Sequence, residues 1–429
     1  MNVRMVRWLR GLVPVWLALL CGALSAQAQQ VPEVAVRIGV ILPVAPATPA
    51  GALSAAVARA AAQGTVLADE EFRFNADLIG LDFAIRTESA SGVAVVAAAE
   101  KLVGDGAYSI IGGFTTEEAT ALGVWAKARG VPYLNVGASA DSLRNELCSP
   151  TTFHIEPSAA MYLDAYVGWY VRSGFRRWYF VREDTAESRA QYDRVRWSMQ
   201  ARHFGAREIG QTNLKPGASG GAALATTITR SGADVVMLLL PASDQLRILG
   251  ELDRAGLTVA ATGFPYPEAQ TRDFFAASAK VAPTLGVGHR ALAWEPTIDA
   301  YGAREYNARY RLRFGEPMET PAWAIYHAVK ILYEEALFVG TVSAKKIMTH
   351  MMSPNSVFDL HKGIGVSFRP WDRQLRQSLY LTKINGKADN PAAYGLLVGE
   401  LPAIYMPGSD LVERLDQLGD LAAQSRCTQ

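Results

Sequence analysis

The sequence predicts an α/β protein with two lobes, each built on a doubly wound parallel sheet. Short apolar runs of strand length alternate with longer segments of helical periodicity along most of the chain, as in successive strand–helix–strand units. The alternation pauses in a polar segment at 142–152 and then starts again, which indicates a second lobe. A chain of 429 residues, 50% of them hydrophobic, is long enough to bury two cores of ordinary size.

The segment 98–141 shows the alternation most clearly. A helical pattern, a short apolar run, a second helical pattern and a second apolar run follow one another there. Gly112 closes the first apolar run, and Gly130 separates the second helix from the second run. Because ligands bind beyond the carboxyl ends of the strands in open parallel sheets, the loops 112–116 and 137–141 should hold a small molecule.

The same reasoning places the other elements along the chain. We expect strands at 34–42, 81–87, 178–181, 208–212, 234–240 and 258–262, and residues 285–292 are expected to run back toward the first lobe. We expect helices at 52–71, 93–103, 158–171, 190–204, 221–231, 244–255, 300–314, 320–337 and 343–352. Residues 365–368 and 378–384 are predicted to form a terminal hairpin.

The chain is expected to pass between the lobes three times, near Phe153, Trp294 and Phe358, and these passages would form a three-segment hinge. The predicted domains follow from these crossings. They are a first lobe at 29–155 plus 293–357, a second lobe at 156–292 plus 358–400, and a C-terminal tail at 401–429.

The N-terminus is predicted to be a signal peptide covering residues 1–28. Arg4, Arg7 and Arg10 precede an apolar stretch, and an Ala-Gln-Ala sequence ending at Ala28 forms a small-x-small cleavage site. Pro14 interrupts the apolar stretch, which is shorter than the roughly 20 residues that span a bilayer. We therefore expect export to the periplasm with cleavage after Ala28.

Charge and motifs exclude several classes of function. The formal net charge is +1, and without the three N-terminal arginines 39 Lys and Arg face 41 Asp and Glu, about −2 with no charged block. This composition argues against nucleic acid as a partner. The six histidines have no metal-ligand spacing, no strand leads into a Gly-x-Ser-x-Gly elbow, and no dinucleotide or Walker loop is present. We therefore expect a protein without enzymatic activity, metal or cofactor.

Two cysteines remain after cleavage, Cys148 and Cys427. An even pair in an oxidising compartment predicts a disulfide that ties the C-terminal tail to the segment between the predicted lobes. The alternative is two unpaired thiols.

Several short motifs in the first predicted lobe carry a family resemblance. They are Lys101-Leu102-Val103, then Ile110-Ile111-Gly112 followed by Thr115 and Thr116, and Gly130-Val131-Pro132 followed by Ala138-Ser139. In this order and spacing they resemble the type I periplasmic binding proteins of the leucine/isoleucine/valine-binding group. The resemblance implies a monomer that closes two lobes on a small polar solute, amino-acid-like or a small organic acid, and delivers it to an ABC permease.

A narrower resemblance rests on patches at 362–368 and 371–377, supported by residues around Arg144, Cys148 and Trp178. These are similar to the substrate-binding proteins of ABC transporters associated with pyrroloquinoline-quinone-dependent alcohol dehydrogenase systems. This similarity leaves an alternative function open, that of a periplasmic accessory or sensory binding module of such a dehydrogenase system without transport.

Hydroxyl groups in the two loops of the first lobe are candidates for binding a ligand carboxylate. Thr115, Thr116 and Ser139, next to Ala138, match the hydroxyl positions of the family, and free N–H groups at a helix N-terminus favour an anion. Alternatively, Thr115 or Thr116 only caps the helix that follows.

A ligand amino group would need a carboxylate from the second lobe. Glu183 and Asp184 follow the predicted strand 178–181, and Glu295 lies at a crossing between the lobes. The alternative for the first two is a solvated loop. Aromatic walls would come from Phe114, Tyr266 and Trp294, although such residues more often belong to a core.

Overall fold

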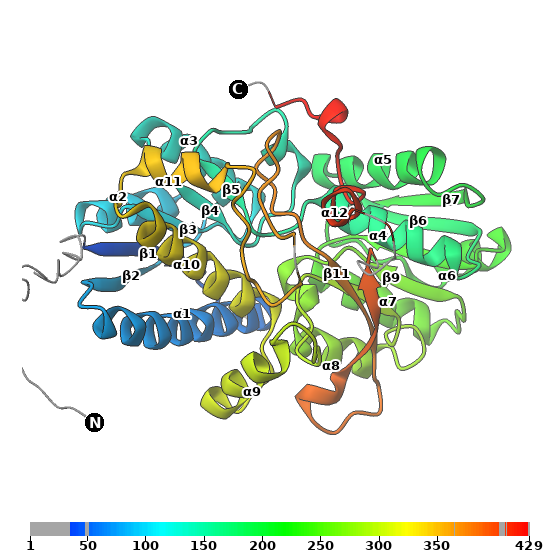
Figure 1. Ribbon diagram of the computed structural model, residues 1–429. Coiled ribbons are helices and arrows are strands. Elements are labelled where there is room, and N and C mark those ends of the chain that lie inside the picture. The colour runs from blue at the N-terminus through cyan, green and yellow to red at the C-terminus, as the bar shows by residue number, and fades with distance from the viewer. Residues whose placement is uncertain (1–34, 48–50, 364, 403–407, 409, 428–429) are drawn as a thin grey trace, which may run out of the picture.

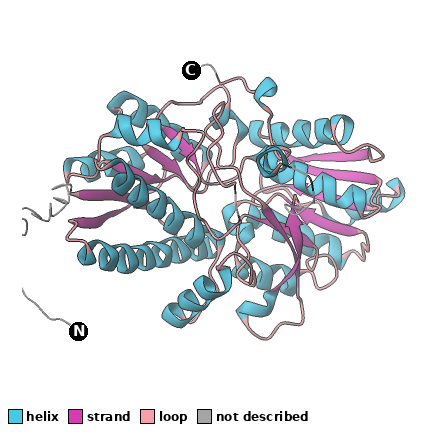
Figure 2. Cartoon of the chain, in the orientation of Figure 1, coloured by secondary structure: helices cyan, strands magenta, loops and turns pink. Residues whose placement is uncertain are grey.

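The computed structural model describes residues 35–47, 51–363, 365–402, 408 and 410–427. The predicted signal peptide, residues 1–28, lies outside these ranges. Two parallel sheets lie side by side, each covered by helices on both faces, as Figures 1 and 2 show. The predicted α/β fold is thereby confirmed. Among the described residues, no helix combines the length and apolar character needed to cross a membrane.

The first sheet contains five parallel strands in the order β2-β1-β3-β4-β5. Its strands are β1 (Val36–Leu42), β2 (Phe83–Ser89), β3 (Ser109–Gly112), β4 (Tyr133–Asn135) and β5 (Thr152–His154). Its helices are α1 (Ala52–Leu78), α2 (Ala94–Gly104), α3 (Thr116–Arg129), α10 (Thr320–Val339) and α11 (Ala344–Met351). Helices α1 and α10 cover one face of this sheet, and α2 and α3 cover the other.

Close packing of α1 against α10 depends on Gly64. A Cβ atom at this position would lie 2.4 Å from the carbonyl oxygen of Ala322 and 2.7 Å from its Cα. Gly64 lies inside the helix predicted at 52–71, and it is the position where the backbones of two helices meet. The buried faces of both helices form one core with β1 and β3.

The second sheet contains four parallel strands in the order β7-β6-β8-β9. Its strands are β6 (Arg177–Glu183), β7 (Arg207–Leu214), β8 (Val235–Leu239) and β9 (Ala260–Gly263). Its helices are α4 (Ala159–Arg172), α5 (Ala186–Ala201), α6 (Gly221–Ser231) and α7 (Ala242–Arg254). In β8, Val235 and Met237 pack with α4 and α5, whereas Val236 and Leu238 pack with α6 and α7. This alternation follows from the two-residue period of a strand and explains why both faces of the sheet are apolar.

A third, antiparallel sheet has the order β10-β11-β12 and corrects the prediction for the C-terminal region. Its strands are β10 (His289–Leu292), β11 (Leu379–Ile384) and β12 (Gly395–Leu401). The predicted hairpin of 365–368 with 378–384 is wrong, because β11 pairs with β10 and β12, and only an isolated bridge joins Phe368 to Leu375. The remaining helices are α8 (Arg272–Val281), α9 (Ala303–Phe314) and α12 (Leu411–Asp416), with 3-10 turns at Asp141–Arg144, Pro267–Gln270, Pro391–Tyr394 and Ala422–Gln424.

Hydrogen bonds join two of the chain passages between the parallel sheets. Gln374 Nε2 donates to the carbonyls of His154 (3.2 Å) and Glu156 (3.1 Å). Gln377 Nε2 donates to the Ile155 carbonyl over 2.6 Å. Lys362 Nζ in turn donates to Gln377 Oε1 over 2.6 Å. The residues of the patches 362–368 and 371–377 therefore hold the passages together. The exact lobe boundaries stay predictions.

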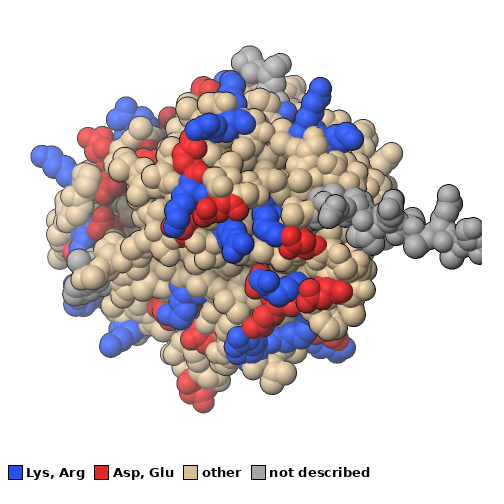
Figure 3. Space-filling view, turned by 90° about the vertical axis from the view of Figure 1, so that its left-hand side faces the viewer, with Lys and Arg blue, Asp and Glu red and all other residues tan. Residues whose placement is uncertain are grey.

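The C-terminal segment is fixed to both halves of the molecule. A disulfide joins Cys148 to Cys427 with a Cα–Cα distance of 5.6 Å, which confirms the predicted pairing. Arg426 Nε pairs with Glu146 over 2.7 Å, and the Gly419 N–H donates to Asp164 of α4 over 3.0 Å. On the face of the molecule drawn in Figure 3, basic and acidic side chains are interspersed.

Candidate functional site

A cavity of about 240 Å³ lies where the carboxyl ends of the strands in the two parallel sheets approach one another, and we call it the small cavity. Its wall is formed by Leu53, Ser54, Phe114, Thr115, Thr116, Glu117, Gly137, Ala138, Ser139, Glu187, Pro241, Ala242, Ser243, Tyr266, Pro267 and Glu268. These residues follow β1, β3 and β4 in the first sheet and β6, β8 and β9 in the second. The small cavity therefore lies where open parallel sheets bind their ligands.

The start of α3 forms one wall of the small cavity. Thr115 is the N-cap, and its hydroxyl accepts a hydrogen bond from the Glu118 N–H over 3.2 Å. Glu118 turns away from the cavity, because its carboxylate accepts from the N–H groups of Gly92 (2.8 Å) and Phe114 (3.0 Å). Thr115 thus caps the helix and also lines the small cavity, whereas the Thr116 hydroxyl makes no hydrogen bond to another described residue.

The loop after β4 brings Ser139 into the same wall. Asn135 accepts from the Ala138 N–H over 3.0 Å and donates to the Ala138 carbonyl over 2.7 Å. Arg144 Nη1 donates to the carbonyls of Ala138 (2.8 Å) and Ala140 (3.1 Å). The loop is therefore fixed by buried side chains on both sides of Ser139.

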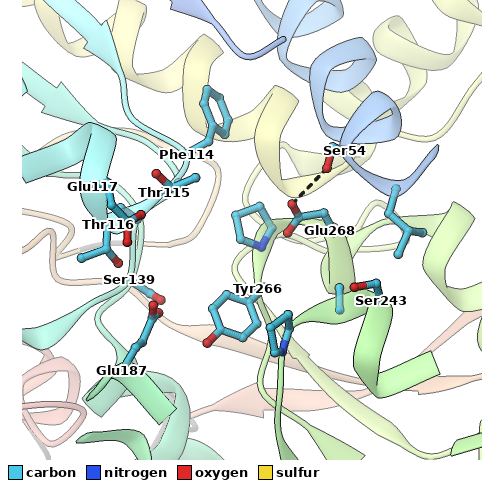
Figure 4. A pocket seen from close by; sticks show the side chains of 16 residues that line it. Ser54, Phe114, Thr115, Thr116, Glu117, Ser139, Glu187, Ser243, Tyr266 and Glu268 are labelled. Carbon is cyan, nitrogen blue, oxygen red and sulfur yellow. Dashed lines mark hydrogen bonds between the residues drawn. The ribbon is translucent and has the colours of Figure 1, made fainter. Parts of the chain in front are cut away.

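The opposite wall contains Tyr266 and Glu187, and Gln191 contacts Tyr266 from behind this wall. Gln191 Nε2 donates to the Tyr266 hydroxyl over 2.9 Å, and Glu187 and Tyr266 both line the small cavity. Burial, together with the negative charge of Glu117, raises the pKa of Glu187 above its usual value. In Figure 4, Thr116 and Ser139 lie on one side of the cavity and Tyr266 lies on the other.

Glu268 is the third acidic residue of the small cavity. It lies in the 3-10 turn after β9, and its Oε1 accepts from the Ser54 hydroxyl of α1 over 3.4 Å, as Figure 4 shows. Burial raises the pKa of this carboxyl group. The Ser54–Glu268 contact links a helix of the first sheet to a turn of the second across the cavity.

A neighbouring cavity of about 770 Å³, the large cavity, shares Thr116, Glu117, Glu187, Pro241 and Tyr266 with the small one. Its other lining residues are Ala140, Asp141, Ser142, Glu146, Ala159, Glu183, Thr185, Ala186, Ser188, Ala190, Gln191, Arg194, Asp420 and Arg426. The two arginines in this wall are already paired with carboxylates, Arg194 with Asp164 (2.5 Å) and Asp420, and Arg426 with Glu146 (2.7 Å). The large cavity therefore presents excess negative charge.

The structure brings six of the ten predicted ligand-binding residues together in the small cavity. These are Phe114, Thr115, Thr116, Ala138, Ser139 and Tyr266. Glu183 lines the large cavity, and burial followed by the nearby Asp244 raises its pKa. Asp184 lies outside both walls, is exposed and pairs with Arg189 over 3.4 Å. Ligand binding by these residues stays a prediction.

Two of the predicted ligand-binding residues, Trp294 and Glu295, lie in the protein interior and not in a cavity wall. Trp294 is 0% exposed and stacks on Trp323 with ring centroids 5.8 Å apart, so it is a core residue and not an aromatic wall. Glu295 is also 0% exposed, and its carboxylate binds Arg272 (2.7 Å) and Thr382 (3.0 Å). The carboxylate is fully occupied inside the protein, so placing it in the ligand site was wrong.

Sequence reasoning missed Glu187 and Glu268. The helix after β6 was predicted to begin at 190, but α5 begins at Ala186 with Thr185 as its N-cap, which accepts from the Ser188 N–H over 3.2 Å. The Thr-x-x-Ser cap was the available signal, and it would have placed Glu187 in the first turn beyond a strand end. Glu268 carries no comparable signal, because a 3-10 turn has no periodic pattern.

The described residues contain no group of three or more His, Cys, Asp or Glu arranged to hold a metal ion. The walls of the two cavities offer hydroxyls, carboxylates and apolar surface. This set can bind a polar solute by hydrogen bonds and charge.

Comparison with known proteins places the chain in a family. The sequence profile described as periplasmic binding protein matches residues 35–390. A search of curated protein sequences gave no match.

Solved structures share the fold over nearly the whole chain. A branched-chain amino acid ABC transporter periplasmic ligand-binding protein from Burkholderia xenovorans has a TM-score of 0.75 at 16% identity, with 91% of this chain and 99% of that chain covered. A leucine-, isoleucine-, valine-, threonine- and alanine-binding protein from Brucella ovis has a TM-score of 0.74 at 16% identity, covering 92% and 98%. An ABC transporter solute-binding protein from R. palustris, in complex with benzoate, has a TM-score of 0.70 at 15% identity, covering 92% and 100%.

These neighbours are described as ligand- or solute-binding proteins and not as enzymes. At 15–16% sequence identity, the similarity to these structures shows only that the fold is shared. The family is shown by the profile match, which covers most of the chain. The chain belongs to the periplasmic binding protein family.

Proposed function

We propose that this protein is the solute-binding component of an ABC importer and binds a small polar solute, amino-acid-like or a small organic acid, between its two parallel sheets. One observation carries the proposal: the wall of the small cavity consists of segments that follow strand ends in both sheets. A ligand there contacts both halves of the molecule at once, so its binding favours the closed arrangement over an open one.

The rest of the proposed function follows from this binding step. The protein is exported by the predicted signal peptide, acts as a monomer, and presents the loaded, closed form to a permease in the inner membrane. The alternative, an accessory or sensory module of a pyrroloquinoline-quinone-dependent dehydrogenase system, rests on the patches 362–368 and 371–377. Polar side chains of those patches hold the passages between the sheets and lie outside both cavity walls.

A thermal-shift panel tests the proposal. The panel contains amino acids, aromatic acids, short alcohols and the oxidation products of those alcohols. A true ligand stabilises only the folded state, so saturation at 100 times its dissociation constant contributes about 2.7 kcal/mol and raises the melting temperature by several degrees. A panel without any such rise would contradict solute binding and would favour the accessory role.

A further inference from the structure

The small cavity contains three carboxylates and no basic side chain in its wall. Glu117 comes from the first turn of α3, Glu187 from the first turn of α5, and Glu268 from the turn after β9. None of the three forms an ion pair with another described residue. Negative charge therefore reaches the cavity from both parallel sheets, and the described wall contains no guanidinium or ammonium group to balance it.

A second feature is a buried hydrogen-bond acceptor that has no partner among the described residues. Gln191 is 2% exposed, lines the large cavity, and has no described partner for its Oε1. The orientation of this amide is set by its neighbours. Its Nε2 donates to the Tyr266 hydroxyl over 2.9 Å. Oε1 is then left as a buried acceptor, which is costly unless a ligand supplies a donor.

The three carboxylates and Gln191 Oε1 are all hydrogen-bond acceptors. Resting on the proposed function above, we propose that the solute bound between the two sheets is a small organic amine with a net positive charge. Its ammonium N–H groups would donate to Glu187 and Glu268, and the Thr116 and Ser139 hydroxyls would complete the hydrogen bonding. A ligand whose only charge is a carboxylate would meet like charges on both walls and is disfavoured.

Four-carbon compounds that differ only in charge test this inference. The probes are butane-1,4-diamine, butylamine, butan-1-ol and sodium butyrate, each added to the full mature protein at low ionic strength. We expect the largest rise in melting temperature with the diamine, a smaller rise with butylamine, and none with the alcohol or butyrate.

Isosteric variants distinguish binding in the cavity from general cation effects. Glu187→Gln and Glu268→Gln should each weaken diamine binding at least tenfold in a calorimetric titration, without loss of melting temperature in the absence of ligand. Glu305→Gln is the matched control, because Glu305 is an exposed residue on α9, paired with its neighbour Arg304, and lies outside both cavity walls. It should leave diamine binding unchanged.

Three results would overturn the inference, and they differ in whether the proposed function survives. Stabilisation by acids but not by either amine would disprove the cationic ligand while the proposed solute-binding function survives. Amine binding of equal strength in wild type, Glu187→Gln and Glu268→Gln would show that the amine binds elsewhere. Absence of stabilisation by these probes and by the whole panel described above would contradict the proposed function as well.

Discussion

Arg144 fixes the loop that presents Ser139 to the small cavity. Its guanidinium bonds to the carbonyls of Ala138 and Ala140 on either side of Ser139, and also to the carbonyl of Glu156 (2.6 Å) and to Gln374 Oε1 (3.0 Å). One side chain therefore connects a cavity loop to two passages between the sheets. A planar group with five donors can make such a set of bonds, whereas lysine could not.

The sequence predicted one wall of the site better than the other. Thr116 and Ser139 could be placed because glycines mark the ends of the preceding strands and a parallel sheet brings those ends together. Glu295 could not be assigned correctly, because its partners Arg272 and Thr382 lie 23 and 87 positions away in the chain. A loop carboxylate in the interior and one in a cavity have the same local sequence pattern.

Buried Glu156 is expected to make stability depend on pH. Burial raises the pKa of its carboxyl group from 4.5 to about 8, so the folded state retains a proton that the unfolded state has lost between these values. The free energy of unfolding should therefore fall as the pH rises from about 5 to 8, at about 1.4 kcal/mol for each unit of pKa difference as an upper bound.

Glu156→Gln isolates this effect. Glutamine keeps an oxygen that can accept from the Tyr162 hydroxyl, a contact of 2.8 Å in the wild type, and it cannot ionise. In urea unfolding the variant should match the wild type near pH 5 and exceed it by a few kcal/mol near pH 8.5. A difference between the two proteins that stays constant with pH would show that Glu156 is ionised throughout.

At the scale of elements, the sequence predicted well the strands and helices that have strong hydrophobic periodicity. It predicted less well where each element ends and which strands pair. The helix at 221–231 matches α6, and the buried run at 234–240 contains β8. Helix α8, between the predicted strand 258–262 and the segment 285–292, was missed, as was β12. Strand pairing in the third sheet could not be derived, because an antiparallel partner is chosen by tertiary packing and not by local periodicity.

Gly64→Ala tests the contact between α1 and α10. Alanine favours an isolated helix by about 1 kcal/mol, but its Cβ would approach the backbone of Ala322 too closely and push the two helices apart. We expect a net loss of about 1 to 3 kcal/mol in chemical denaturation, because overpacking of a rigid contact outweighs the propensity gain.

Gly104→Ala is the matched control, because no atom lies within 4 Å of a Cβ built there at the last position of α2. It should leave stability unchanged or raise it slightly. If both variants were equally stable, the account of the α1–α10 contact would be wrong.

At the scale of the whole molecule, the C-terminal segment acts as a strap between the two halves. The tail is held on the second sheet through Asp164 of α4 and Arg194 of α5, and the disulfide joins its end to Cys148 beyond the 3-10 turn that follows β4. The even number of cysteines and the predicted export predicted the bond but not this path, which crosses the rim of the large cavity.

Removing the disulfide should lower stability without removing the fold. Cys148 and Cys427 are 279 positions apart, and the chain-entropy account assigns about 2 to 4 kcal/mol to a typical disulfide. We expect Cys148→Ser, combined with Cys427→Ser to avoid a free thiol, to melt several degrees lower than the wild type under non-reducing conditions. The difference should vanish when both proteins are measured with reductant, and a difference that persists there would have another cause.

The most direct test of solute binding at the strand ends is a calorimetric titration of a double variant, Thr116→Ala with Ser139→Ala. The titrant is the compound that gives the largest thermal shift among all those named above, and circular dichroism checks that the variant keeps the wild-type fold. Because both hydroxyls line the small cavity, we predict an affinity at least tenfold below that of the wild type. An unchanged affinity in a correctly folded variant would place the ligand elsewhere and contradict the account.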